Sequence, residues 1–172
     1  MSLELPPNFE NDIQGRDISI YPFVLIDDGG LNIRISTNAI TIGTDFHKPL
    51  LLNIPSLKES IDIEKRNYKI SSVNLDISNY EYEGVRFSDL VGNTSLINME
   101  VLIYWGSQST VDYGSAFNVY NGTIRRYTHD DEKVRLVVED RSQATLHKDL
   151  PLPNTATQIN WLGSGTDVPD KY

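Results

Sequence analysis

Apolar and polar residues alternate over several separate stretches of this chain, which is the pattern of a β-strand that buries one face. The clearest stretches are NMEVLIYWGSQ, residues 98–108, and KVRLVVED, residues 133–140. The positions that share one face are Met99, Val101, Ile103 and Trp105 in the first stretch and Val134, Leu136 and Val138 in the second. The sequence therefore predicts an all-β fold.

Two further stretches flank an Asp-Gly pair. Residues 17–27 are rich in β-branched and aromatic residues, DDGG follows, and the next stretch, LNIRIST, has Leu31, Ile33 and Ile35 on one face. Glycine tolerates positive φ in a tight turn, so we expect a β-hairpin here. Pro22 lacks a backbone N–H, which predicts an edge strand or a bulge at its position.

The longest strand pair is expected in residues 57–80. Ile61 and Ile63 precede a turn near residues 65–67, and Tyr68 and Ile70 follow it. The next apolar residues have the opposite parity and are Val73, Leu75 and Ile77. One bent strand with a bulge near Ser71 and Ser72 would keep both sets facing one core.

The stretch SAFNVYNGTIRRYT has two interpretations. Asn121 and Gly122 could form a hairpin turn, with arms about four residues long. Alternatively, the stretch is a single long strand with a glycine bulge at Gly122. In both cases THDDEK, residues 128–133, is the loop that leads into the strand 133–140.

Helical patterns are few. Only residues 139–150 are expected to form an α-helix, with Ala144, Leu146 and Leu150 apolar and with Pro151 ending it; Ser88 and Asp89 could cap one turn at most. We therefore predict an extended N-terminal arm over 1–15, a β-domain over 16–150 and a linker-like segment over 151–172. That last segment predicts that the chain is the N-terminal part of a longer one.

Composition narrows the function. The chain has no cysteine, which excludes disulfides, thiolate zinc sites and cysteine nucleophiles. The net charge of -9 disfavours direct nucleic-acid binding. No apolar run approaches the roughly 20 residues that span a bilayer, and the N-terminus does not resemble a secretory signal, so synthesis in the cytosol is expected.

One polar cluster, His129, Asp130, Asp131 and Glu132, invites a chemical interpretation. Neighbouring residues of a hairpin loop point in divergent directions, and such residues are common in turns, so a turn is the favoured interpretation. A metal-dependent hydrolase centred on His129 and Asp131 is the alternative. A zinc site formed by His47, His129 and His147 is disfavoured because the three lie on unrelated segments. We predict no catalytic residue, no metal ligand and no cofactor.

Aromatic residues supply the interface candidates. Tyr80 and Tyr82 are two positions apart, which on an extended segment places both rings on one face. They would suit a sugar platform or a protein contact. Trp161 lies in the linker-like segment and is expected to dock on a neighbouring domain or subunit.

Several quoted stretches resemble the N-terminal part of tail proteins of marine tailed bacteriophages. They are ISTNAITIGTDFHKPLLLNIPSLKESIDIEKRNYKISSVNLDISN, RFSDLV, YNGTIRRYTHDDEKVRLVVEDRSQATLHKDLPLP and VPDKY. Those proteins resemble the baseplate-hub class, in which tail-tube-like β-barrel domains form a ring at the distal end of the tail. The resemblance implies that GTIRRYTHDDEKVRLVVED is a barrel hairpin and that RSQATLHKDLP is the helix after it.

The combined prediction is a mostly antiparallel β-barrel or sandwich that serves as a structural virion protein and not as an enzyme. It would form a homo-oligomer, with a trimer favoured, and connect the tail tube to fibres or a spike, with exposed strand edges and arms as joints. The alternative is a carbohydrate- or receptor-binding β-module that uses Tyr80, Tyr82 and either Trp105 or Trp161.

Overall fold

The computed structural model describes residues 4–27, 29–53, 55–57, 59–62, 67–70 and 72–141. The chain divides into a first unit, residues 1–141, and residues 142–172, which lie outside the described residues. The described part of the first unit is mostly antiparallel β-structure, which confirms the all-β prediction.

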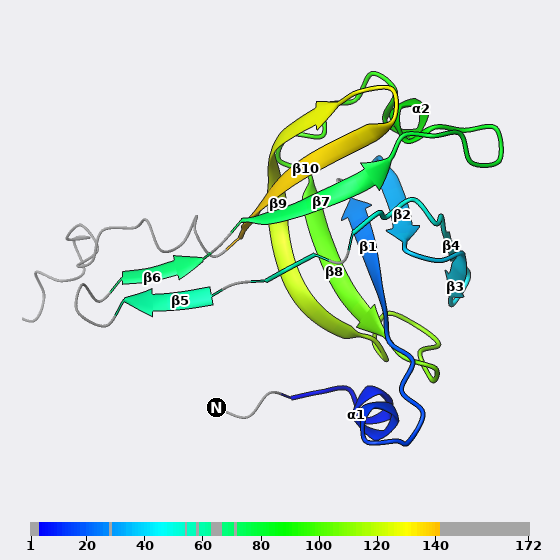
Figure 1. Ribbon diagram of the computed structural model, residues 1–172, viewed down its shortest axis with the longest axis vertical. Helices are drawn as coiled ribbons and strands as arrows, with labels where there is room; N and C mark the ends of the chain where they lie inside the picture. Colours follow the sequence, from blue (N-terminus) through cyan, green and yellow to red (C-terminus); the bar gives the residue numbers. More distant parts are fainter. Residues whose placement is uncertain are drawn as a thin grey trace, which may run out of the picture. The chain divides into compact units, whose positions relative to one another are not determined.

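Six strands form the main sheet, which curls into a half-barrel (Figure 1). Their spatial order is β2 (Asn32–Ser36), β1 (Tyr21–Asp27), β8 (Glu100–Gly106), β9 (Phe117–His129), β10 (Lys133–Asp140) and β7 (Val73–Ser78). All neighbours in this sheet are antiparallel. Two small hairpins are separate sheets: β3 (Ile40–Ile42) with β4 (Asp45–His47), and β5 (Glu59–Asp62) with β6 (Asn67–Ile70).

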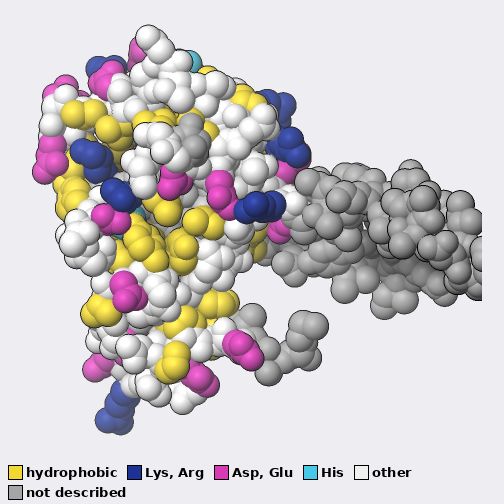
Figure 2. All heavy atoms as spheres, turned by 180° about the vertical axis from the view of Figure 1, so that it is seen from behind, with side chains coloured by type: hydrophobic (Ala, Val, Ile, Leu, Met, Phe, Trp, Pro, Cys, Tyr) yellow, Lys and Arg dark blue, Asp and Glu magenta, His cyan; other side chains and the backbone are white. Residues whose placement is uncertain are grey.

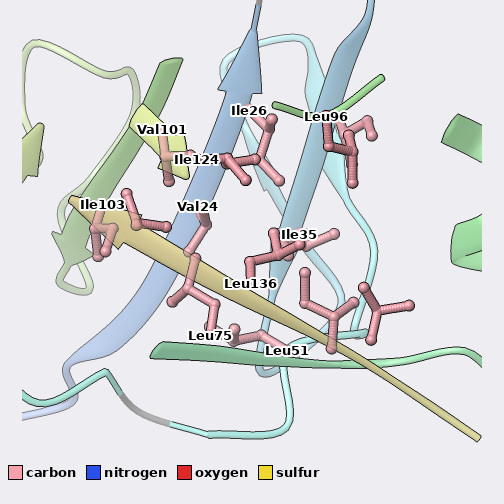
Figure 3. Packing of buried hydrophobic residues seen from close by; sticks show 14 of the residues in the cluster. Val24, Ile26, Ile35, Leu51, Leu75, Leu96, Val101, Ile103, Ile124 and Leu136 are labelled. Carbon is pink, nitrogen blue, oxygen red and sulfur yellow. The ribbon is translucent and has the colours of Figure 1, made fainter. Parts of the chain in front are cut away.

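The concave side of the main sheet carries the core (Figure 3). Alternate residues of each strand point inward because successive side chains of a strand lie on opposite faces. The completely buried members of the core on the six strands are Val24, Ile26, Ile35, Val73, Leu75, Ile77, Val101, Ile103, Ile124, Leu136 and Val138. The alternation in the sequence therefore predicted the buried face of β2, β7, β8 and β10.

A short segment closes the gap between the two edge strands of the sheet, and we call residues 48–53 the seam. Lys48 pairs with Ile35 of β2 in a parallel bridge, and Leu51 pairs with Ile77 of β7 in an antiparallel one. Lys48 N donates to Arg34 O over 3.1 Å, and three further backbone hydrogen bonds continue the ladder: Ser36 N to Lys48 O, Leu51 N to Ser36 O and Ser78 N to Leu50 O. The sheet thus curls far enough for one segment to form backbone hydrogen bonds with both of its edge strands.

The side chain of Asn53 extends the seam along β7. Its Nδ2 donates to Asn74 O over 3.1 Å, and its Oδ1 accepts from Asp76 N over 2.8 Å. A side-chain amide carries the same donor and acceptor as a peptide group, so Asn53 acts as one more rung of the ladder. Along the residues that the seam covers, β2 and β7 are bound by their own chain, so the expectation that open edges serve as joints fails there.

β9 is a single strand, which decides between the two interpretations of its sequence. Its bulges lie at Val119 and Arg125, which the pairings with β8 and β10 leave without a partner, and not at Gly122. Gly122 is required for space, because a Cβ there would lie 2.5 Å from Glu139 O and 2.8 Å from the ring of Tyr120. A glycine is therefore needed at this position, but the reason is close packing and not a bulge.

Residues 7–13 differ from the extended conformation that the sequence predicted, because they form helix α1 (Pro7–Ile13). Pro7 is the first helical residue, where proline lacks only an N–H that has no helical partner anyway. Phe9 is buried against Phe117 at a ring distance of 5.7 Å, and Asp12 accepts hydrogen bonds from the backbone and hydroxyl of Ser109.

The other expected helices have mixed outcomes. The single turn near Ser88 is confirmed as α2 (Phe87–Val91), where Asp89 accepts a hydrogen bond from Arg86 N. The helix expected over 139–150 starts too early, because Glu139 and Asp140 belong to β10, and residues 142–150 lie outside the described residues.

One strand prediction needs correction, and the prediction for Pro22 holds at its own position. The bent strand through residues 68–77 is instead two strands, β6 and β7, in different sheets, because the chain leaves the small hairpin before it joins the main sheet. Pro22 lies in β1, which has neighbours on both sides. The pairing with β2 begins only at Phe23, so at Pro22 the strand is locally an edge.

Candidate functional surfaces

The polar cluster of the sequence is the turn between β9 and β10. Asp130 organises it: its Oδ1 accepts from Glu132 N over 2.9 Å and from Lys133 N over 2.7 Å. These two backbone donors hold the pKa of the Asp130 carboxyl below its usual value. The carboxylate is already used by the turn, which supports the turn interpretation.

Asn79 ties this turn to α2 and was not predicted from the sequence. Asn79 is only 3 % exposed. Its Nδ2 donates to Asp130 O, its backbone N donates to Glu132 O, and its Oδ1 accepts from Ser88 N. A buried amide with both ends satisfied fixes the geometry of the elements it joins. It follows a strand in the sequence like many exposed asparagines, so no local signal distinguishes it.

Among the described residues, no arrangement of side chains at this cluster supports a metal-dependent hydrolase. His129 is exposed and stacks on Tyr127 at a ring distance of 6.4 Å, and His47 is buried on another element. Within the described ranges no group of three or more His, Asp or Glu side chains is arranged to hold a metal ion, and His147 lies outside them. An open hollow of about 430 Å³ beside the turn is lined only by polar and charged residues, whereas ligand pockets are mostly apolar.

The predicted pair of tyrosines does not form one platform. Tyr82 closes a tight turn with Val85 through two backbone hydrogen bonds, and the turn residues Glu83 and Gly84 both have positive φ. Tyr82 packs against the main core, whereas Tyr80 is 60 % exposed. A hydrogen bond from the Tyr80 hydroxyl to Glu132 raises the pKa of Tyr80. Trp161 lies outside the described residues, and Trp105 is half-buried in β8.

A second apolar cluster lies on the convex side of β1 and β8, and the sequence did not predict it. Its buried members are Phe23, Ile42 and Ala116, and Tyr104 stacks on Phe23 at a ring distance of 5.1 Å. The hairpin β3–β4 supplies Ile42 and brings His47 against the ring of Phe23, also at 5.1 Å. The main sheet is therefore covered on both faces at this place.

His47 is completely buried in this region. Its Nδ1 lies 3.3 Å from Asp45 O, so Nδ1 carries the proton, and its Nε2 has no partner among the described residues. Burial lowers the pKa of His47, because a second proton would have to be placed on Nε2 away from water.

Arg34 and Tyr113 hold the same hairpin from outside. Arg34 forms an ion pair with Asp45 at 3.1 Å, and the Tyr113 hydroxyl donates to the same carboxylate over 3.1 Å. Burial and this hydrogen bond raise the pKa of Tyr113 to about 12. The network is a structural clamp, since every charged member has its opposite charge or a hydrogen bond.

The remaining convex surface carries ion pairs between neighbouring strands. Arg135 of β10 meets Asp76 of β7 at 2.9 Å, and Arg125 of β9 meets Glu139 of β10 at 3.0 Å. The face seen in Figure 2 likewise mixes both signs of charge with hydrophobic side chains. A phosphate backbone would require a surface with one dominant positive sign. Among the described residues no helix is long and apolar enough to cross a membrane.

No family model and no curated protein matches the sequence. Among solved structures, a chain from the virion of a native gene transfer agent particle matches with a TM-score of 0.56. The likeness concerns the fold. The two chains are 8% identical, and the match covers 87% of this chain and 48% of the other, so this chain spans about half of the length of the chain it matches.

Proposed function

We propose that this chain is a structural virion protein of a tailed phage or a phage-like particle. The observation that carries the proposal is the fold similarity over 87% of this chain to a chain from a gene transfer agent virion. In that role, copies of the chain form a ring, with a trimer favoured, at the distal end of the tail. The ring joins the tail tube to fibres or a spike.

The way the barrel is sealed supports a building-block role. The seam covers part of both edge strands, β2 and β7, with the chain's own backbone. A monomer can therefore fold before it assembles. The hairpin β5–β6 pairs with no other strand in the described part of the chain. An isolated two-stranded hairpin is marginally stable in water and gains stability from a neighbour, which a ring would provide.

The alternative of a carbohydrate- or receptor-binding module depended on a shared aromatic face. Tyr80 and Tyr82 do not share one, so no observation on the described residues favours this function, and it is not proposed.

The proposal is tested on particles purified from the phage that encodes the chain. We expect mass spectrometry of the purified particles to detect the chain, and light scattering on the 172-residue chain to give a multiple of its 19.5 kDa mass. A protein that is missing from the particles and stays monomeric at high concentration would contradict the proposal.

A further inference from the structure

A groove lies beside the first half of β2, next to the point where the seam begins at Lys48. The hollow has a volume of about 190 Å³. Residues of β2 form one wall, β4 and Lys48 form a second, and α2 supplies Leu90. The apolar lining residues are Leu31, Ile33, Phe46 and Leu90.

One side of the groove is a strand edge. Arg34 O and the backbone of Ser36 point away from β1, since they bond to the seam. Backbone groups of alternate residues of a strand point to the same side, so Asn32 also faces away from β1. The seam bonds begin at Arg34, which leaves the exposed Asn32 beyond them. An extended peptide can add to such an edge as a further strand.

The walls have apolar surface available to such a peptide. Phe46 is a large hydrophobic residue and 43 % exposed. Its neighbours are both fixed, because Asp45 forms the ion pair with Arg34 and His47 hydrogen-bonds to Asp45 O. Leu90 is half-buried on the opposite side. A rigid hairpin that leaves one phenyl ring in water offers a pre-organised contact for an apolar side chain.

The charge of the groove differs from that of the whole chain. Arg34 and Lys48 line it and no acidic residue does, although the net charge of the chain is -9. Arg34 already has Asp45 as a partner. Lys48 has no ion pair in the described part of the chain, and its ammonium lies 5.6 Å from the centre of the Tyr82 ring. A carboxylate on the occupant would pair with Lys48.

We propose that this groove binds an extended, acidic segment of another protein of the same particle. The segment adds a short strand at the Asn32 end of β2, inserts an apolar side chain between Phe46 and Leu90, and places a carboxylate near Lys48. This inference rests on the proposed function, because it takes the occupant from the proteins of the virion.

The test is an array of overlapping 12-residue peptides from the other structural proteins of the particle, probed with the full-length chain. We expect the bound peptides to contain an aspartate or glutamate within two or three residues of a large apolar residue. Dissociation constants for these peptides are then measured by fluorescence anisotropy. The charge reversal Lys48→Glu is expected to weaken binding about ten-fold or more, which corresponds to loss of about 1.4 kcal/mol. Lys48→Arg is expected to retain binding.

Two matched controls separate the groove from the rest of the surface. Arg16→Glu makes the same kind of charge reversal at an exposed position outside the groove lining, and Val111→Ser removes an apolar side chain that is 65 % exposed. Both are expected to bind as the unchanged protein does, whereas Phe46→Ser is expected to bind weakly. Circular dichroism melting checks that each variant is folded.

Two results would overturn the inference. They are an array without bound peptides, and peptides that bind Lys48→Glu and Phe46→Ser as well as the unchanged chain. The presence of the chain in purified particles is measured independently, so the groove can fail while the structural role stands.

Discussion

Leu51 tests whether the seam closes a true interior. Its side chain is 4 % exposed and points into the barrel with the core of the main sheet (Figure 3), whereas the next residue, Leu52, is 53 % exposed. Burial of a leucine contributes about 1.5–3 kcal/mol, and truncation in a well-packed interior adds the cost of a cavity. We therefore expect Leu51→Ala to lower the free energy of unfolding by about 3 kcal/mol.

The assay is equilibrium unfolding in urea together with a thermal melt. For a chain of this size, a loss of about 3 kcal/mol lowers Tm by about 6–12 °C. Leu52→Ala is the matched control, because it makes the same chemical change one residue along the same segment, and we expect a change within about 0.5 kcal/mol. Equal and small effects of the two substitutions would mean that the seam does not seal the barrel, and the description of the edges would then be wrong.

Three further predictions concern local features. Gly122→Ala places a methyl group against Glu139 O, and we expect a loss of about 1–3 kcal/mol in urea unfolding; an unchanged midpoint would show that β10 can yield. The pKa of His47 is lowered in the folded state, so the unfolded state binds more protons below about pH 6.5. The free energy of unfolding therefore decreases as the pH is lowered below this value, by up to about 1.4 kcal/mol per pH unit. Urea titrations between pH 7.5 and pH 5 should show this slope and lose it in His47→Phe, while His129→Gln at the exposed turn retains it. Asp130→Ala removes two acceptor contacts from the turn and should lower Tm above pH 5; faster amide exchange at Glu132 and Lys133 would accompany it, and unchanged exchange would contradict the role of Asp130.

The sequence predicted the strands better than their connections. Period-two alternation depends only on which face of a strand is buried, so Val134, Leu136 and Val138 were placed correctly from their spacing. Apolar and polar residues do not alternate in the seam. Its backbone pairs with β2 at one end and with β7 at the other, and both strands are distant in sequence. Nothing local in KPLLLN indicates a partner near residue 35 and another near residue 77.

The errors at candidate sites have similar causes. The prediction of one face for Tyr80 and Tyr82 assumes an extended segment, but β7 ends at Ser78 and the chain bends at Tyr80. From the sequence, His47 is a candidate only for a disfavoured zinc site. Its actual surroundings depend on Phe23 and Tyr113, which come from distant parts of the chain.

The hydrogen bonds of Asn53 to Asn74 and Asp76 also determine where the chain leaves the barrel and where it returns. The excursion between them, which includes the hairpin β5–β6, begins and ends at neighbouring points on one edge. Doubling the length of a flexible loop costs only about 0.6 kcal/mol of closure entropy. Related chains could therefore exchange this excursion for a longer, shorter or differently folded one while keeping the same barrel, so a new contact could evolve without a new fold.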